Sequence, residues 1–159
     1  MSAGKPWLQH GWIQHSQYII ESYKSLLGYP LIDAHGSETE QAKSLFNAPF
    51  VVVSHGTQAD PLLNYANRVA MQLWKISIPT LLKTPSRMTA EAMHRDERAN
   101  LLARTTRDGF VDDYRGIRIA TDGQRFLIER ATVWNLADTS GHYVGQAATF
   151  DNWTPLNER

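Results

Sequence analysis

Residues 110–153 contain three segments rich in β-branched and aromatic side chains, separated by two short turn signals. The turns are TDG at residues 121–123 and DTSG at residues 138–141, and each ends in a glycine. Glycine supplies the positive φ of a tight hairpin, whereas a crossover between parallel strands needs about a dozen residues or more. The stretch therefore predicts three consecutive antiparallel strands, a β-meander around which the remaining elements must be arranged.

The middle strand of this meander has no clearly polar face. One parity includes Phe126, Ile128 and Trp134, and the other includes Leu127 and Val133. Because side chains alternate between the faces of a strand, both faces of the sheet must be at least partly covered. We expect the domain's own helices to cover one face, and either the N-terminal segment or a partner chain to cover the other. Regular alternation puts Phe126 and Trp134 on the same face of the sheet, and we expect that face to lie beneath the N-terminal helix.

Helical signals dominate the N-terminal part of the chain. Apolar residues recur at helical spacing over residues 12–27, and Gly28 followed closely by Pro30 marks the end of that helix. Ser37 and Glu40 have the spacing of a capping box, which predicts a second helix that runs to about Phe46.

Short strands and helices fill the middle of the chain. Residues 50–53 and 62–65 predict a hairpin, because two β-favouring runs flank a polar turn. Asn67 and Thr89 are the expected caps of the first and last of the helices that follow. These helices are predicted at residues 67–74, 76–82 and 90–107.

This order of elements predicts an α+β domain with a small cavity between an antiparallel sheet and its helices. We divide the chain into an N-terminal helical segment at residues 1–48, a domain at residues 49–153 and a tail at residues 154–159.

The composition excludes several classes of protein. With 16 basic and 16 acidic side chains the formal net charge is zero, so we expect no nucleic-acid partner. The absence of cysteine excludes disulfides, thiolate nucleophiles and photochemistry that requires a cysteinyl adduct. No apolar run approaches the ~20 residues of a membrane span or the core of a signal peptide. We expect a cytoplasmic protein with no membrane partner.

Several motifs are similar to those of one family. They are SHGTQADPLLNYANRVAMQLW, PSRMTAE, DDYRGIRI, and RFLIERATVWNL followed by GQAATFDNW. Together they resemble the MEKHLA domain, which occurs in stand-alone bacterial proteins and at the C-terminal ends of plant homeodomain–leucine zipper transcription factors. The resemblance covers about residues 7–153. It points to the stand-alone bacterial form, because the chain has no homeodomain and no zipper heptads.

MEKHLA domains in turn resemble PAS domains, which are sensory and dimerisation modules with a five-stranded antiparallel sheet and helices on one face. Residues 62–67 are similar to the I-x-Y-x-N pattern of PAS sequences, and residues 122–128 to their DG-x-x-F hairpin. The resemblance agrees with the strand order predicted above. It implies sensing or regulation through analogy of fold.

Ser54, His55 and Asp60 suggest a hydrolytic triad at first sight. Adjacent residues of a strand point to opposite faces, so Ser54 and His55 are poorly placed to act as a nucleophile and its base. The sequence also lacks a G-x-S-x-G elbow. We therefore expect no evident catalysis, and we assign Asp60 to the turn that precedes Pro61.

The histidines offer two further readings. His94 stands in a predicted helix where some PAS domains place a haem ligand, but its charged neighbours favour an exposed position. His10 and His15 lie five residues apart, which is poor spacing for two metal ligands on one helical face, so we expect both to face solvent. We predict no metal and no cofactor, with haem or flavin as the alternative.

Two charged residues interrupt the apolar strands. Arg118 and Glu129 would form a partly buried pair if they share a face, and either could instead bind a polar ligand. Trp74, Tyr114 and Trp134 either line the cavity or belong to an aromatic core. The candidate ligand-binding residues are Trp74, His94, Tyr114, Arg118, Glu129 and Trp134.

The leading prediction is a PAS-like sensory or regulatory domain that binds a small, mainly apolar molecule or a regulatory protein. The signal would pass through the N-terminal helix and the outer sheet face. A homodimeric interaction module with a filled core is the alternative, and an enzyme of unassigned reaction is a third. We expect the chain to be a homodimer.

Overall fold

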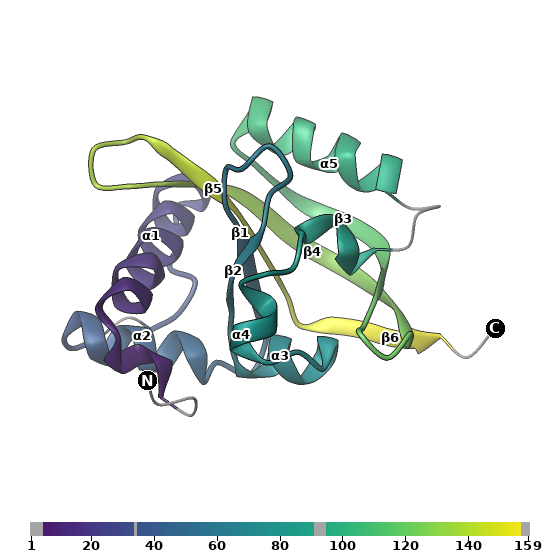
Figure 1. Ribbon diagram of the computed structural model, residues 1–159. Helices are drawn as coiled ribbons and strands as arrows, with labels where there is room; N and C mark the ends of the chain where they lie inside the picture. The colour runs from purple at the N-terminus through teal and green to yellow at the C-terminus, as the bar shows by residue number, and fades with distance from the viewer. Residues whose placement is uncertain (1–4, 34, 91–94, 157–159) are drawn as a thin grey trace.

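Helices enclose an antiparallel sheet from both sides in the computed structural model, which describes residues 5–33, 35–90 and 95–156 (Figure 1). The helices are α1 (His10–Leu27), α2 (Glu38–Phe46), α3 (Arg68–Trp74), α4 (Ile78–Leu81) and α5 (Arg95–Asp108). Short 3-10 helices occur at η1 (Pro6–Leu8) and η2 (Ser86–Thr89). Within the described ranges, no helix is both long enough and apolar enough to cross a membrane.

Five strands form the main sheet in the order β2-β1-β5-β4-β3, and every neighbouring pair is antiparallel. The strands are β1 (Val51–His55), β2 (Leu63–Ala66), β3 (Phe110–Ile119), β4 (Arg125–Ala137) and β5 (Tyr143–Phe150). Consecutive pairing of β3, β4 and β5 confirms the predicted meander. The predicted α+β fold with a five-stranded antiparallel sheet is therefore confirmed.

A sixth strand, β6 (Asn152–Leu156), continues the sheet after a bend at Asp151. It pairs with residues 125–129 of β4, and Gln124 Nε2 donates to the carbonyl of Leu156 at 2.9 Å. The prediction of a tail from residue 154 onward is wrong for residues 154–156, because their backbone pairs with the first half of β4.

A β-bulge in β4 changes which face its side chains occupy. Phe126 and Ile128 belong to the same buried cluster as Ala131 and Val133, so the parity shifts between residues 128 and 131. The pairing with β3 is irregular at this point, and Arg130 has φ of 55°. A bulge inserts one extra residue and reverses the alternation beyond it.

The bulge explains why one expectation of the sequence analysis is half wrong. Trp134 lies beneath the N-terminal helix, with its ring 4.9 Å from that of Tyr23. Phe126 lies on the opposite face, with its ring 5.3 Å from that of Trp74. Regular alternation would have kept Phe126 and Trp134 together.

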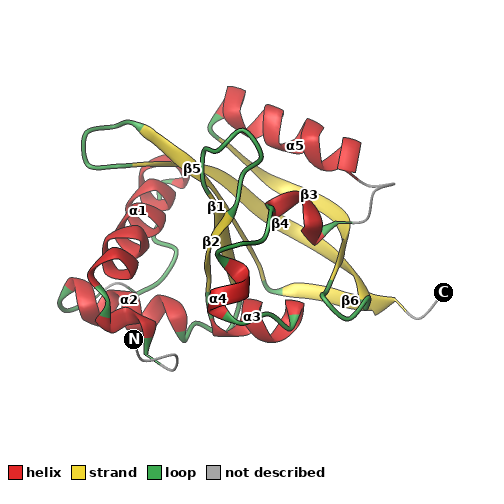
Figure 2. Ribbon diagram, viewed as in Figure 1, coloured by secondary structure: helices red, strands yellow, loops and turns green. Residues whose placement is uncertain are grey.

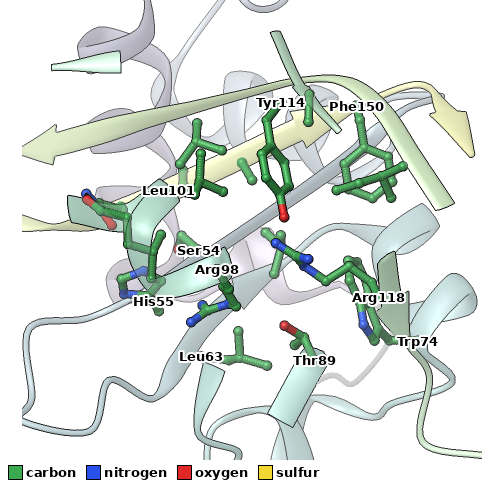
Figure 3. A pocket seen from close by; sticks show the side chains of 18 residues that line it. Ser54, His55, Leu63, Trp74, Thr89, Arg98, Leu101, Tyr114, Arg118 and Phe150 are labelled. Carbon is green, nitrogen blue, oxygen red and sulfur yellow. The ribbon is translucent and has the colours of Figure 1, made fainter. Parts of the chain in front are cut away.

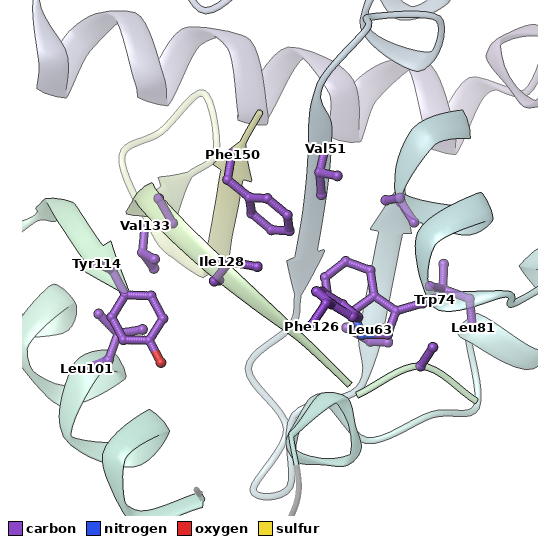
Figure 4. Close-up of a cluster of buried hydrophobic side chains, with 14 of the residues drawn as sticks. Val51, Leu63, Trp74, Leu81, Leu101, Tyr114, Phe126, Ile128, Val133 and Phe150 are labelled. Atoms are coloured by element: carbon purple, nitrogen blue, oxygen red, sulfur yellow. The ribbon is translucent and has the colours of Figure 1, made fainter. Parts of the chain in front are cut away.

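Separate sets of helices cover the two faces of the sheet (Figure 2). We call the face that carries Trp134 the outer face; α1 and α2 pack there through Ile19, Ile20 and Leu45. We call the other face the inner face; α3, α4 and α5 pack there around a second cluster shown in Figure 4. The N-terminal segment, rather than a partner chain, therefore covers the outer face.

The helix ends follow the predicted capping signals in most places. Gly28 ends α1 with φ of 85°, and Ser37 and Glu40 form the reciprocal bonds of a capping box. The last helix differs, because Thr89 lies in η2 and Ala90 has extended backbone angles of −131° and 149°. The predicted helix therefore does not begin at residue 90.

Asn67 joins α2, β1 and α3 through four hydrogen bonds while it is fully buried. Its Oδ1 accepts from the backbone N–H groups of Val52 and Ala70, each at 3.1 Å. Its Nδ2 donates to the carbonyls of Phe50 at 2.7 Å and Leu45 at 3.3 Å. One side chain thus caps α3 and fixes the corner between the helical segment and the sheet.

Replacing Asn67 by alanine should cost roughly 3 kcal/mol or more in the free energy of unfolding, because several buried backbone groups lose their partner. Chemical unfolding of the purified variant measures this cost. Asn100→Ala is the matched control, since Asn100 is exposed on α5 and should have almost no effect. A cost below about 1 kcal/mol for Asn67→Ala would contradict this role.

His15 is not solvent-facing as expected, because α1 packs it against the sheet. Its Nε2 lies 2.8 Å from Ser54 Oγ, and its ring centre lies 6.0 Å from that of Tyr65. Burial lowers the pKa of His15 to about 4. A neutral imidazole is therefore part of the contact between α1 and β1.

Stability should fall as the pH drops from about 6.5 to about 4. His15 has the higher pKa in the unfolded chain, so the unfolded chain takes up a proton in this pH window before the folded chain does. The contribution of the neutral His15 to stability is therefore complete only above the window. His15→Gln should remove up to about 3 kcal/mol of this dependence, measured by urea unfolding at pH 7 and pH 4.5. His10→Gln, exposed on the same helix, should keep the wild-type dependence. Identical pH profiles for wild type and His15→Gln would refute this assignment.

Candidate ligand-binding site

A small cavity of about 60 Å³ lies between the inner face of the sheet and α5 (Figure 3). Most of its wall is apolar and includes Leu63, Leu101, Ile128, Val133 and Phe150. Such a space is large enough for at least one water molecule or one small polar group.

Two arginines enter this cavity from different elements. Arg118 comes from β3 and is only 6% exposed, and Arg98 comes from α5 and is half-buried. Arg118 Nη1 donates to the carbonyl of Ile117 at 2.9 Å, and its guanidinium lies 5.1 Å from the centre of the Tyr114 ring. Arg98 donates to Ser86 Oγ. Figure 3 shows Arg98, Arg118 and Tyr114 around the same space.

The positive charges of the pair act on each other. Burial, and then the charge of Arg118, lower the pKa of Arg98 to about 10, so the Arg98 guanidinium remains charged at neutral pH. Within the described residues, neither arginine has a carboxylate oxygen within the 4.0 Å of an ion pair. The cavity therefore holds two close cations in an apolar wall, which is unfavourable without a compensating group.

Tyr114 is fixed at the edge of the cavity by close packing on its own strand. Its hydroxyl donates to Glu97 Oε1 at 3.0 Å and lies directly above the backbone of Gly116. A Cβ atom at Gly116 would lie 2.1 Å from Tyr114 Oη and 2.9 Å from Glu97 Oε1. Position 116 therefore needs glycine because the tyrosine hydroxyl occupies the space of a side chain.

His55 adds a neutral polar group to the same cavity. Its Nδ1 lies 3.0 Å from the carbonyl of Gly56, so the ring donates there and Nε2 is left as an acceptor. Nε2 is buried without a hydrogen bond from the described part of the chain. Burial, followed by the charge of Arg98, lowers the pKa of His55.

Gln146 fixes the position of α5 over the sheet. It is 2% exposed, and its Nε2 donates to Thr106 Oγ1 at 2.9 Å and lies 3.0 Å from Asn135 Oδ1. This connection between β5 and α5 holds the helix that carries Arg98. Gln146 therefore positions the site from the side opposite to β3.

A second and larger cavity of about 670 Å³ adjoins the first and opens toward solvent. The two share Val53, Leu63, Trp74 and Thr89 in their walls. The wall of the second cavity is mainly apolar and comes from α3, α4, η2 and the end of β3. Its volume lies in the range of about 300–1,000 Å³ that small-molecule sites have.

Three of the predicted ligand-binding residues lie together at this site. Trp74 lines both cavities, and Tyr114 and Arg118 line the smaller one. Trp134 belongs to the cluster under α1 instead, on the outer face. His94 lies outside the described residues, so the haem alternative stays a prediction.

The expected pair between Arg118 and Glu129 is wrong. Glu129 Oε2 lies 3.3 Å from Arg115 Nε in an exposed ion pair, away from the buried Arg118. Arg115 and Arg118 differ by three positions along β3, so their side chains point to opposite faces. Regular alternation along β4, counted back from Trp134, would put Glu129 on the inner face, but the bulge at Arg130 reverses the alternation.

The residues once considered as a triad do not meet. Ser54 Oγ lies between His15 Nε2 and Asn64 Oδ1, at 2.8 Å and 2.5 Å. Asp60 accepts from Arg87 Nε at 3.1 Å on the exposed side of the turn. His55 bonds to neither of them within the described structure, which agrees with the prediction that these residues form no nucleophile–base pair.

Arg98 is the main site residue that the sequence analysis missed, because its charged neighbours suggested an exposed face. A signal was present in the helical spacing. Arg98 precedes Leu101 by three positions and Thr105 by seven, and both of these are buried. Residues at that spacing share a helical face, so Arg98 belongs to the stripe that faces the sheet.

Gly116→Ala should displace the Tyr114 ring and cost about 1–3 kcal/mol in the free energy of unfolding, as overpacking does. Thermal or chemical unfolding measures it, together with the double variant Gly116→Ala/Tyr114→Leu. If the clash with the ring is the cause, the double variant should cost less than the sum of the single ones. Gly11→Ala, on an open helix surface, should be neutral or stabilising. Additive costs would argue against the proposed clash.

Solved structures similar to this chain are PAS and light-oxygen-voltage domains. A PAS domain from Colwellia psychrerythraea superposes with a TM-score of 0.60 at 15% identity, covering 71% of this chain and 94% of that chain. A fungal light-oxygen-voltage domain photoreceptor gives 0.57 at 17% identity, covering 84% and 91%. These likenesses show the PAS-like fold.

A third similar structure is a PAS domain in complex with ethanol, from a LuxR-family transcriptional regulator of Burkholderia thailandensis. Its TM-score is 0.53 at 15% identity, and the match covers 69% of this chain and 94% of that one. A comparison with curated protein sequences found no match. The model of the MEKHLA domain matches residues 13–155, nearly the whole chain, and the protein therefore belongs to the MEKHLA domain family.

Proposed function

We propose that this protein is a sensory domain that binds a small, mainly apolar molecule between the inner face of its sheet and helices α3–α5. The observation that carries this proposal is the pair of adjoining cavities, one of about 60 Å³ and one of about 670 Å³. A well-filled core has few voids larger than a water molecule, so a space of this size at a polar cluster favours a binding site.

The relatives support this proposal without defining the ligand. The similar ethanol-bound domain is part of a transcriptional regulator, and the light-oxygen-voltage domains belong to photoreceptors. Membership of the MEKHLA family and the PAS-like fold support a sensory role for this chain. The ligand chemistry must come from this chain's own residues.

A route from the cavity to the surface runs through β4. Val133 contributes to the wall of the smaller cavity, and its neighbour Trp134 points to the outer face. Trp134 packs against Tyr23 of α1 with an angle of 82° between the rings. A shift of β4 on ligand binding would therefore change the packing of α1, so α1 is the proposed output element.

Screening by thermal unfolding tests the proposal. At least one compound of a library of small apolar and amphipathic molecules should raise the melting temperature by about 5–10 °C at a concentration near 100 times its Kd. Ala120→Leu, which adds volume inside the larger cavity, should abolish this increase. Ala99→Leu, on the exposed side of α5, should preserve it.

The result against a ligand-binding role is equally clear. If no compound stabilises the wild type, or if Ala120→Leu responds as the wild type does, the cavities are not the binding site. Native mass spectrometry of the same samples reports the oligomeric state and any retained ligand.

A further inference from the structure

The polar groups of the smaller cavity have an excess of unused hydrogen-bond donors. A guanidinium carries five N–H donors. Within the described residues, Arg118 donates to one carbonyl and interacts with the Tyr114 hydroxyl, and Arg98 donates to one hydroxyl. The indole N–H of Trp74, which lines both cavities, is buried and has no acceptor in the described part of the chain.

The acceptors that the described residues offer here, including the unpaired His55 Nε2, are neutral or exposed and do not balance the two positive charges. Among the described acidic residues, Glu97 approaches the cavity, but its Oε1 accepts from Tyr114 and its side chain is exposed. Thr89 lies on the wall, where its hydroxyl donates to the carbonyl of Ser86 at 2.8 Å and can offer the arginines only a neutral oxygen. Buried charges in proteins are normally paired, so the two arginines favour a negatively charged group from outside the chain.

We propose that the ligand is an amphipathic carboxylic acid, whose carboxylate lies between Arg98 and Arg118 and whose apolar body extends into the larger cavity. This inference rests on the proposed function and specifies the chemistry of that same site. A carboxylate is planar and accepts two parallel N–H bonds from one guanidinium. It therefore suits a confined space lined by two guanidinium groups.

The volumes of the two cavities agree with this division of the ligand. The space beside the arginines, about 60 Å³, suits a group of carboxylate size. The adjoining space of about 670 Å³ has a wall that includes Ala66, Ala70, Ile76 and Leu81, which suits a hydrocarbon chain or ring. Leu63 and Trp74 lie on the wall of both, where the two parts of such a ligand would join.

Calorimetric titration with three probes of equal length tests the proposal: octanoate, octanamide and octylammonium. We expect the wild type to bind octanoate at least about tenfold more tightly than octanamide, because a charge-assisted hydrogen bond is worth that much, and to bind octylammonium most weakly. The measurement uses a zwitterionic buffer at neutral pH and low salt, where octanoate is ionised.

Variants separate the roles of the arginines from a general effect of charge. Arg118→Gln and Arg98→Gln should each bring the affinity for octanoate down to that for octanamide, and Arg118→Lys should retain part of the preference. Arg115→Gln is the matched control, since Arg115 lies on the same strand in an exposed ion pair. It should retain the full preference for octanoate.

A second measurement covers the case in which a variant folds poorly. Without any ligand, Arg118→Gln should unfold at the same or a higher temperature than the wild type, because it removes an unpaired buried charge. Strong destabilisation of that variant in the absence of ligand would overturn the proposal, since it would show that the contacts of Arg118 with Ile117 and Tyr114 already compensate its burial.

The outcomes distinguish this inference from the proposed function. Equal binding of octanoate and octanamide would overturn the carboxylate assignment and leave a cavity that binds apolar molecules. An unchanged preference in both Arg118→Gln and Arg98→Gln would also overturn it. If no probe binds and the library screen also fails, the binding function itself is wrong.

Discussion

The sheet of this protein is apolar on both faces, and the rest of the structure follows from the need to cover each face. Trp134 and Leu136 face outward, and both are fully buried only because α1 and α2 lie over them. Phe126 and Ile128 face inward, where the helices α3, α4 and α5 leave space between them. The outer layer is thus packed by the chain's own N-terminal segment, while the inner layer retains cavities.

Local signals predicted the fold well because each depends on neighbours in the sequence. The glycine turns gave the meander, and the Ser37 capping box and the Asn67 cap lie where expected. Face assignments in β4 failed because a bulge at Arg130 reverses the alternation, and no simple composition signal marks it. The pairing of Glu129 failed for the same reason, since its partner depends on the register of two strands.

The site was predicted in part. Tyr114 and Arg118 are four positions apart and share one face of their strand. A correct prediction of the face for either residue therefore holds for the other. Arg98 was missed because a run of charged residues at the start of α5 outweighed its helical phase with Leu101. Arg98 becomes a site residue through its proximity to Arg118, which is distant in sequence. Only the folded chain shows that these two cations share one apolar cavity without an ion pair between the described residues.

Two-dimensional ¹H–¹⁵N spectra of the arginine Nε–H groups during a titration with octanoate test whether Arg98 and Arg118 bind a carboxylate, because they observe the guanidiniums themselves. We expect the signals of Arg98 and Arg118 to shift together and to saturate with a stoichiometry of one octanoate per protein, while the signal of Arg115 stays in place. Shifts confined to exposed arginines, or no saturable shift at Arg98 and Arg118, would contradict a carboxylate-binding sensory cavity.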